Sequence, residues 1–232
     1  MHDAKHSTDR QARRIRSFVR REGRLTPGQQ KALDALWPQY GLVAEQDMDL
    51  AAAFGRWAPL TLEIGFGNGD SLAEMATREP DNNFVGIEVH RPGVGHLLSE
   101  IKRRELTNVR IFCHDAIEVL NRSISDDCLE RVLLFFPDPW PKRKHHKRRI
   151  VQPNLIRLLA HKLKHGGRFH MATDWRHYAE HMMAVMEASD LFTNVAGRGH
   201  YSPRPVYRPV TKFEQRGRRL GHGVWDLIFQ RT

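Results

Sequence analysis

Residues 131–150 read RVLLFFPDPWPKRKHHKRRI, and this stretch predicts the fold class of the chain. It begins with a short apolar run, Val132 to Phe136, which stops at a proline and is typical of a buried, parallel strand. Pro137 and Pro139 fix φ and remove backbone donors, so the strand ends there and the backbone is stiff. Asp138 is therefore expected at the carboxyl end of a buried strand, where open α/β sheets bind their ligands.

A cationic block follows this corner. Six of the eight residues after Pro141 are lysine or arginine, with no acid to balance them: Lys142, Arg143, Lys144, Lys147, Arg148 and Arg149. The other two, His145 and His146, are expected to contact phosphates or to be solvated, because no Cys or acid lies at metal-ligand spacing around them. A lone charge run is usually a solvated loop. Here it adjoins a rigid Pro-Asp-Pro-Trp corner, which favours a binding site.

The composition bounds the class of protein. The 232 residues, 40% of them hydrophobic, suit one α/β domain with extensions. Lys plus Arg number 37 against 27 Asp plus Glu, and the net charge of +10 favours a polyanionic partner, nucleic acid first and anionic membrane second. The apolar runs are far shorter than the roughly 20 residues of a membrane span, and the start has no signal-peptide core. Cys113 and Cys128 offer no CxxC pair and no disulfide framework, which fits a cytoplasmic protein.

The N-terminal residues 1–25 carry seven arginines and are expected to form a basic, mobile arm. Such arms either bind nucleic acid or are solvated, and the net charge favours binding. After the arm, Thr26-Pro27-Gly28-Gln29 predicts a helix start with a capping box, and the helix is expected to end before Pro38. We expect residues 26–232 to form a single domain.

A glycine-rich turn follows the first predicted strand, 60–64. Its pattern is G-x-G-x-G, starting at Gly65 and Gly67, with an acid, Glu63, two residues before the first glycine. Glycines there let the backbone turn sharply and approach a ligand closely. A dinucleotide site has G-x-G-x-x-G, and a strand-end acid would repel its pyrophosphate. The same acid suits a sulfonium cation, which favours S-adenosyl-L-methionine, although a turn of this kind also occurs as an ordinary strand-to-helix connection.

Acidic residues close four successive predicted strands: Glu63, Glu88, Asp115 and Asp138. In α/β nucleotide sites, an acid at the position of Glu88 accepts the ribose hydroxyls. Asp115 is placed to reach an adenine amino group. A single acid of this kind is more often a helix cap or a surface residue, but four in register favour a cofactor site.

The remaining pattern predicts alternating strands and helices. Strands are expected at 84–88, 108–112, 168–173 and 224–229, and helices at 93–106, 117–121, 150–163, 178–188 and 212–220. The helix at 150–163 is expected to stop at His165-Gly166-Gly167. A loop at 197–209, rich in Gly, Pro, Arg and Tyr, is expected near the nucleic acid that the net charge favours.

Five segments together resemble the bacterial tRNA (guanine-N7-)-methyltransferase family. They are LEIGFGNGDSL (62–72), FVGIEVHRPGV (84–94), NVRIFCHDA (108–116), FFPDPWPKRKHHKRRIVQP (135–153) and TKFEQRGRRLGHGVWDL (211–227). The likeness extends from Thr26 to the C-terminus, and the PDPW and TKFE blocks make it specific. It implies a Rossmann-like class I methyltransferase fold, with a mostly parallel seven-stranded sheet and helices on both faces. It also implies methyl transfer from S-adenosyl-L-methionine to N7 of a variable-loop guanine (position 46) in tRNA.

The resemblance also implies roles for individual residues. The cofactor positions are Glu63, Gly65, Gly67, Glu88, Asp115 and Asp138. The substrate positions are Lys142, Asp174, Thr211, Lys212, Phe213 and Glu214, and the RNA-binding positions are Lys144, His145, His146, Lys147, Arg148 and Arg149. The arm before Thr26 matches no pattern of the family, and Pro141 stands at a position that the family does not fix.

The implied chemistry needs no general base, because guanine N7 has a free lone pair and no proton. A carboxylate beside the base would stabilise the positive charge that develops on the purine. Asp138 is the first candidate for this catalytic role and Asp174 the second. Glu214 would accept from the guanine N1–H and N2–H₂ edge. Trp140 either stacks on a base or walls the pocket.

Other functions stay open at this point. The chain could be a methyltransferase acting on another RNA, a small molecule or a protein, or a non-catalytic RNA-binding relative. The basic block argues against a small substrate, and the complete set of strand-end acids argues against loss of the cofactor site. We expect no metal and no membrane association, and both monomer and homodimer fit the sequence.

Overall fold

The computed structural model describes residues 23–44, 48–211, 214 and 223–232. Within these residues the chain forms one eight-stranded sheet in the order β1-β4-β3-β2-β5-β6-β8-β7. The strands are β1 (Gly41–Leu42), β2 (Leu60–Ile64), β3 (Asn83–Ile87), β4 (Val109–Phe112), β5 (Leu129–Phe135), β6 (Leu163–Thr173), β7 (Phe192–Asn194) and β8 (Trp225–Arg231). Strands β1 to β6 are mutually parallel, whereas β8 is antiparallel to both of its neighbours. The expected mostly parallel sheet is therefore present.

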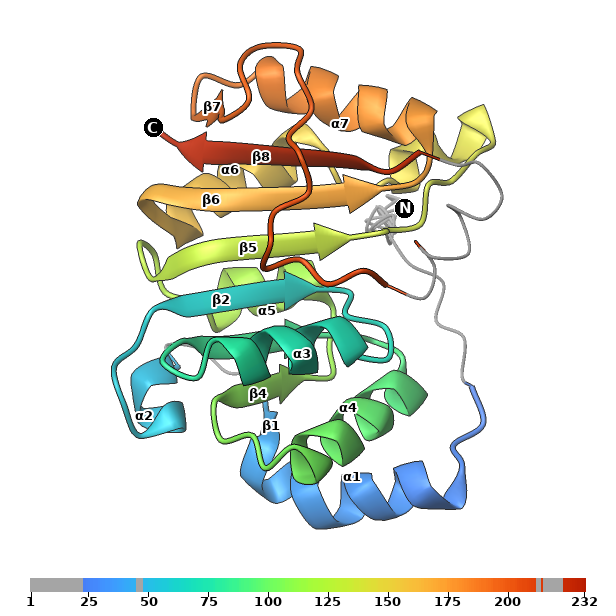
Figure 1. Cartoon of the computed structure of the whole chain (residues 1–232), viewed down its shortest axis with the longest axis vertical. Coiled ribbons are helices and arrows are strands. Elements are labelled where there is room, and N and C mark those ends of the chain that lie inside the picture. The colour runs from blue at the N-terminus through green and yellow to red at the C-terminus, as the bar shows by residue number, and fades with distance from the viewer. Residues whose placement is uncertain (1–22, 45–47, 212–213, 215–222) are drawn as a thin grey trace, which may run out of the picture.

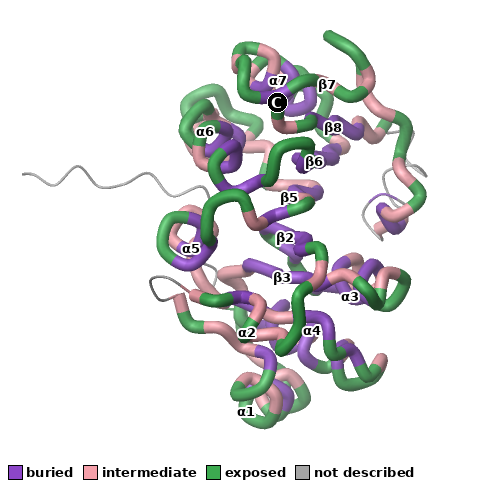
Figure 2. The backbone as a smooth tube through the Cα atoms, turned by 90° about the vertical axis from the view of Figure 1, so that its left-hand side faces the viewer, coloured by how far each residue is buried: buried purple, intermediate pink, exposed green. Residues whose placement is uncertain are grey.

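Helices cover both faces of the sheet (Figure 2). The helices are α1 (Pro27–Tyr40), α2 (Leu50–Phe54), α3 (Asp70–Arg78), α4 (Arg91–Arg103), α5 (Ala116–Arg122), α6 (Pro153–Lys162) and α7 (Arg176–Glu187). Side chains of α1, α3 and α4 belong to one apolar cluster, and those of α2, α5, α6 and α7 belong to another. Every residue of β2 and β3 is buried between these layers, and most of these residues are apolar.

The N-terminal helix α1 forms as its capping signal predicts. Thr26 Oγ1 accepts from the Gln29 backbone N–H, and Gln29 Oε1 accepts from the Thr26 N–H. The helix does not end before Pro38, however, but continues to Tyr40. Pro38 lies in the last turn, where it removes a single helical hydrogen bond, and the Gly41 N–H closes the end on the Trp37 carbonyl.

Three expectations about the elements were wrong. The predicted helix 150–163 is shorter, since Pro153 begins α6, and β6 already starts at Leu163. Gly166, expected to help end that helix, instead lies inside β6 with φ 79°, where the β5–β6 register shifts. The seven-stranded sheet gains β1, a two-residue strand beside β4, and neither β7 nor the short helix α2 was predicted. The predicted helix 212–220, apart from Glu214, and most of the arm 1–25 lie outside the described residues.

The strand order reverses between β2 and β5, and this places the site. The connection after β2 runs through α3 to β3 on one side, whereas the connection after β5 runs through α6 to β6 on the other, so the two leave the carboxyl ends of neighbouring strands in opposite directions. Open α/β sheets form their ligand crevice at such a switch point. The arrowheads of β2, β5 and β6 point to the same edge in Figure 1, and the Pro-Asp-Pro-Trp corner follows β5 at that edge.

Candidate functional site

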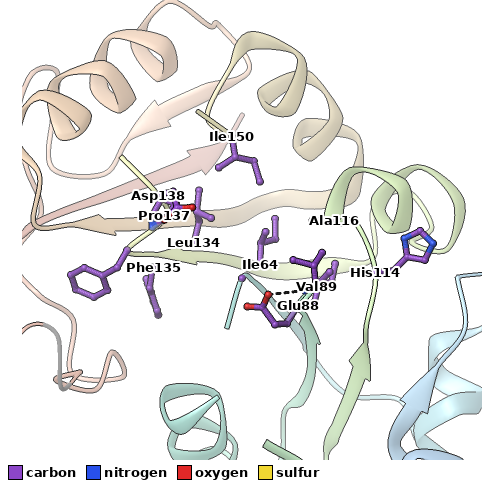
Figure 3. Close-up of a pocket in the computed structure, with 13 residues that line it drawn as sticks. Ile64, Glu88, Val89, His114, Ala116, Leu134, Phe135, Pro137, Asp138 and Ile150 are labelled. Atoms are coloured by element: carbon purple, nitrogen blue, oxygen red, sulfur yellow. Dashed lines mark hydrogen bonds between the residues drawn. The ribbon is translucent and has the colours of Figure 1, made fainter. Parts of the chain in front are cut away.

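A pocket of about 230 Å³ lies at the carboxyl ends of β2, β3 and β5. Three residues expected at the cofactor line it, namely Gly65, Glu88 and Asp138. Figure 3 shows Asp138 and Glu88 toward opposite ends of the pocket, with Ile64 between them. Its walls are mainly apolar, from Ile64, Leu134 and neighbouring residues, so few polar groups are available to orient a ligand.

The glycine turn between β2 and α3 has the conformation that its sequence predicts. Gly65 and Gly67 have φ of +71° and +60°, a region that other residues rarely adopt, and a Cβ on either would meet open space. Gly93, at the start of α4, lies so close that a Cβ there would stand 2.0 Å from the Gly67 carbonyl oxygen. The turn therefore leaves backbone exposed toward the crevice and packs its other side against α4.

The Glu88 carboxylate is already held by the backbone around it. Oε2 accepts from the Gly67 N–H at 2.9 Å, and Oε1 accepts from the N–H groups of Val89 and His90 at 2.7 and 3.0 Å. A carboxylate offers about four acceptor sites, so roughly one remains. Glu88 thus ties the glycine turn to the end of β3, and it can accept one ribose hydroxyl without giving up these bonds.

Glu63, the last but one residue of β2, is 2% exposed, and its Oε2 has no hydrogen-bond partner among the described residues. Burial, and next the nearby charge of Glu88, raise the pKa of Glu63 to about 8. An isolated buried carboxyl of this kind is costly unless a donor or a cation completes it. The orphaned acceptor beside an open glycine turn fits a cofactor that carries ammonium and sulfonium groups, as S-adenosyl-L-methionine does.

Asp115 caps a helix, which is the usual structural role of an acid directly after a strand. It is the N-cap of α5, where its Oδ1 accepts from the Ile117 and Glu118 N–H groups. Its other oxygen, Oδ2, has no partner in the part of the chain that the structure describes. His114 and Ala116 on either side line the pocket, so this cap stands at its rim.

The corner after β5 is strained at both ends. Phe136 and Trp140, neither of them glycine, have φ of 51° and 46°. Such left-handed residues cost on the order of 1–3 kcal/mol each and concentrate at functional sites. Between them, Pro137 and Asp138 line the pocket, and the Asp138 side chain is exposed. The corner therefore presents a carboxylate to the pocket on a stiff backbone.

The cationic block, expected to be a loop, forms the 3₁₀ helix η1 (Arg143–Arg148). The side chains of Lys142, Lys144 and Lys147 are exposed and available to an anionic partner, as is Arg143. His145 and His146 are half-buried. Desolvation and, next, the repulsion of the neighbouring cations lower the pKa of His145, which favours its neutral form.

The last two arginines of the block turn inward. The Arg148 guanidinium lies 4.9 Å from the centre of the Trp140 ring, and His145 meets the same ring edge-on at 5.8 Å. Trp140 thus has protein partners, which supports a role as a wall of the site. Arg149 is 4% exposed, so the expected phosphate contact of Arg149 does not fit this arrangement.

The substrate residues expected after β6 that the structure describes do not line the pocket. Asp174 directly follows β6 at the same edge of the sheet and is half-buried. Thr211 Oγ1 accepts from the Glu214 N–H at 3.1 Å. Glu214 is fully buried, and its Oε2 accepts from Arg208 at 2.6 Å, so it is not open to a guanine edge as we expected. Lys212 and Phe213 lie outside the described residues.

A buried polar network behind Glu214 could not be anticipated from the sequence patterns above. Arg208, also fully buried, donates to both oxygens of Asp226, and Asp226 accepts from His170 at 2.8 Å. The Tyr207 hydroxyl lies 2.9 Å from His170 Nδ1. Burial lowers the pKa of His170, and this neutral ring donates to Asp226 and accepts from Tyr207. The one signal in the sequence that could have indicated this network is the presence of polar residues, His170 and Asp226, inside otherwise apolar strands.

Two further features are absent from the described residues. They contain no group of three or more His, Cys, Asp or Glu side chains arranged to hold a metal ion. None of the helices they form is long and apolar enough to cross a membrane.

Comparison with known proteins places the chain in a family. Residues 57–227 match a family described as "Putative methyltransferase". The tRNA (guanine-N(7)-)-methyltransferase of Alcanivorax borkumensis is 58% identical over 99% of this chain and 97% of its own length, and that of Hydrogenovibrio crunogenus is 60% identical over 94% and 92%. Among solved structures, the 16S rRNA methyltransferase KamB superposes with a TM-score of 0.59 over 81% of this chain and 95% of its own, at 14% identity, which confirms the methyltransferase fold. The chain belongs to the tRNA (guanine-N7-)-methyltransferase family.

Proposed function

We propose that this protein transfers a methyl group from S-adenosyl-L-methionine to N7 of a guanine in the variable loop of tRNA, position 46, and so forms 7-methylguanosine. The observation that carries the proposal is that the Pro137–Trp140 corner lies between the pocket and the cationic helix η1. It lines a pocket suited to a cationic cofactor, and it leads directly into the exposed cations of η1. The activity for which relatives 58–60% identical to the chain are named supports the same conclusion.

The residues of the pocket would hold the cofactor by complementary charge. Glu63 supplies a buried acceptor, Glu88 an acceptor for a ribose hydroxyl, and the turn at Gly65 and Gly67 close backbone contact. Asp115 presents its remaining oxygen at the rim. When bound, S-adenosyl-L-methionine supplies an electrophilic methyl group, and the N7–carbon bond forms as the carbon–sulfur bond breaks. The residues must align these atoms and exclude water.

Asp138 is the proposed catalytic residue. Its carboxylate is exposed at the pocket, on a corner that two strained residues and two prolines keep stiff. Positive charge develops on the purine as N7 is methylated, and a preorganised carboxylate stabilises it. No proton leaves N7, so Asp138 orients and stabilises rather than removing a proton. Asp174, at the end of the neighbouring strand, is a second carboxylate for the base.

The RNA would be bound by its phosphates on the η1 side of the site. Lys142, Lys144 and Lys147 are exposed there, and phosphate contacts position an RNA without specifying its sequence. The net charge of +10 adds long-range attraction. Thr211 and the neighbouring Lys212 and Phe213 complete the proposed substrate contacts. We place the activity in a single domain, residues 26–232, acting in the cytoplasm without a metal, with the arm 1–25 as a further candidate for RNA contact.

The test is methyl transfer from labelled S-adenosyl-L-methionine to unmodified tRNA, followed by nucleoside analysis. The expected product is 7-methylguanosine at one variable-loop guanine, and tRNA in which this guanine is replaced by adenine should accept no label. Label in another nucleoside, or in another RNA only, would contradict the proposed substrate. Cofactor binding without any transfer would point to a non-catalytic RNA-binding protein.

A further inference from the structure

Arg149 differs from the other cations of the basic block in its environment. It follows η1 directly, and its residue is 4% exposed, whereas Lys144 and Lys147 are exposed to solvent. A side chain buried to this extent cannot reach an RNA phosphate without leaving its present contacts. Its position in the sequence therefore suggests a contact with RNA phosphate, whereas its position in the fold suggests a contact within the protein.

Three groups surround the Arg149 guanidinium. Nε donates to the backbone carbonyl of Pro139 at 3.0 Å, and Nη2 donates to His146 Nε2 at 3.2 Å. The guanidinium carbon, Cζ, lies over the Tyr178 ring on α7, 4.8 Å from the ring centre. These contacts join the residue after Asp138, the helix η1 and the helix α7 through one side chain.

The site around Arg149 is specific for arginine. The contacts of Arg149 among the described residues include no ion pair with a carboxylate, and burial lowers its pKa, although an arginine stays charged at neutral pH. Its charge is met by a carbonyl, an imidazole and an aromatic face. A lysine has neither the planar fork nor the flat surface needed to satisfy all three at once. A buried cation without a carboxylate partner destabilises the folded protein. We therefore expect a functional role of Arg149 beside a structural one.

We infer that Arg149 is a positioning residue, which holds the Pro137–Trp140 corner at a fixed distance from η1 and thereby sets the place of Asp138 relative to the bound RNA. The inference rests on the proposed function, because it needs the RNA on η1 and the reaction at Asp138. Tyr178 is fully buried and packs in the core, so α7 supplies the fixed base of this arrangement. Loss of the arginine would free the corner and leave the exposed lysines in place.

Arg149→Met and Arg149→Lys test the inference. Both should lower the single-turnover rate at saturating tRNA by about ten- to a hundredfold, because small misplacements of a reacting group have effects of this size. The dependence of tRNA affinity on salt should stay that of the parent. Arg157→Met, the same change at an exposed arginine on α6, should leave both quantities unchanged. Lys147→Met should flatten the salt dependence by about 0.7–0.9 in slope, as expected when one phosphate is no longer neutralised.

The inference is overturned if Arg149→Met flattens the salt dependence as Lys147→Met does while the saturating rate stays that of the parent. It also fails if neither Arg149 variant changes the rate. Should Arg149→Met not fold, Arg149→Lys, which keeps the charge and the aliphatic stem, decides the matter.

A second measurement does not depend on activity. Hydrogen–deuterium exchange should become faster at the Asp138 and Trp140 amides in Arg149→Lys and not in Arg157→Met, and unchanged exchange would count against the inference. If the parent itself methylates no tRNA, the proposed function has failed, and the exchange experiment still tests the role of Arg149.

Discussion

At the scale of one residue, the buried Glu63 side chain makes the stability of the protein depend on pH. Its pKa is raised from 4.5 to about 8 by burial and by Glu88, so between these pH values the folded protein holds a proton that the unfolded chain has released. The stability that the protonated Glu63 side chain contributes is therefore fully present below pH 4.5. As the pH rises from 4.5 to about 8, the free energy of unfolding falls by at most about 1.4 kcal/mol per pH unit.

We therefore predict that Glu63→Gln, which cannot ionise, gains stability over the parent as the pH rises from 5 to 8. The difference should amount to a few kcal/mol at pH 8, from the pKa shift of Glu63. Urea unfolding of both proteins at several pH values, without cofactor, measures it. Glu130→Gln, at an exposed glutamate of β5, should show a pH dependence parallel to that of the parent. Parallel curves for Glu63→Gln would show that Glu63 is ionised in the folded protein.

Replacement of Asp138 distinguishes two catalytic roles, stabilisation of positive charge and removal of a proton. Asp138→Asn keeps the shape and removes the charge, so the methyl-transfer rate should fall on the order of a hundred- to a thousandfold. The affinity for tRNA should hardly change, because phosphate contacts dominate it. Single-turnover rates of the parent should be flat between pH 6 and 8. A log-linear rise with pH that disappears in the Asn variant would instead identify Asp138 as a general base.

At the scale of an element, η1 and the arginine that follows it divide their cations between two tasks. Arg148 covers Trp140 and Arg149 contacts Pro139, whereas the lysines face solvent. The predicted phosphate contacts are therefore fewer than the run of charges suggests. Helix geometry alone explains part of this, because a 3₁₀ helix turns every three residues and cannot present all of its side chains on one side.

Replacement of both Lys144 and Lys147 by alanine should weaken tRNA binding and flatten its salt dependence by about 0.7–0.9 in slope for each phosphate that is no longer neutralised. Binding titrations at several salt concentrations measure the slope. A matched control replaces Lys102 and Lys164, which are exposed at the end of α4 and near the start of β6, away from the pocket. Equal slopes in the two double variants would mean that η1 contributes only net charge.

At the scale of the whole molecule, the network around Arg208 joins the C-terminal part of the chain to the sheet. Arg208 binds Asp226 on β8 and Glu214, and Asp226 in turn accepts from His170 on β6. Although burial acts to raise the pKa of Asp226, hydrogen bonds from His170 and Arg208 lower it, so the carboxylate stays charged. The segment that holds the expected substrate residues Thr211 and Glu214 is attached through this network.

Arg208→Met should lower the free energy of unfolding by roughly 3–5 kcal/mol, because it leaves two buried carboxylates without their cation. Urea unfolding measures this. Arg198→Met, at an arginine whose side chain is almost fully exposed, should change stability by no more than about 0.5 kcal/mol. A decrease in Arg208→Met as small as that in Arg198→Met would show that the carboxylates find other partners or protons.

The sequence by itself determined the alternating strands and helices, the glycine turn and the edge of the sheet at which the site lies. These depend on local physics. An apolar run, a proline or a glycine with positive φ acts within a few residues, and parallel strands bring their carboxyl ends to one edge. The acids that follow four strands could thus be predicted to lie at one edge of the sheet, where Glu88 and Asp138 line the pocket.

Only the tertiary structure decided which charges face a ligand and which face the protein. Lys147 and Arg149 look equivalent in the sequence, yet one is exposed and the other packs on Tyr178, 29 positions further along the chain. Glu214 likewise matches a substrate position but is paired with Arg208. The role of a charged side chain depends on its distance from partners remote in sequence and on its burial. Both are properties of the packed chain, which no local pattern encodes.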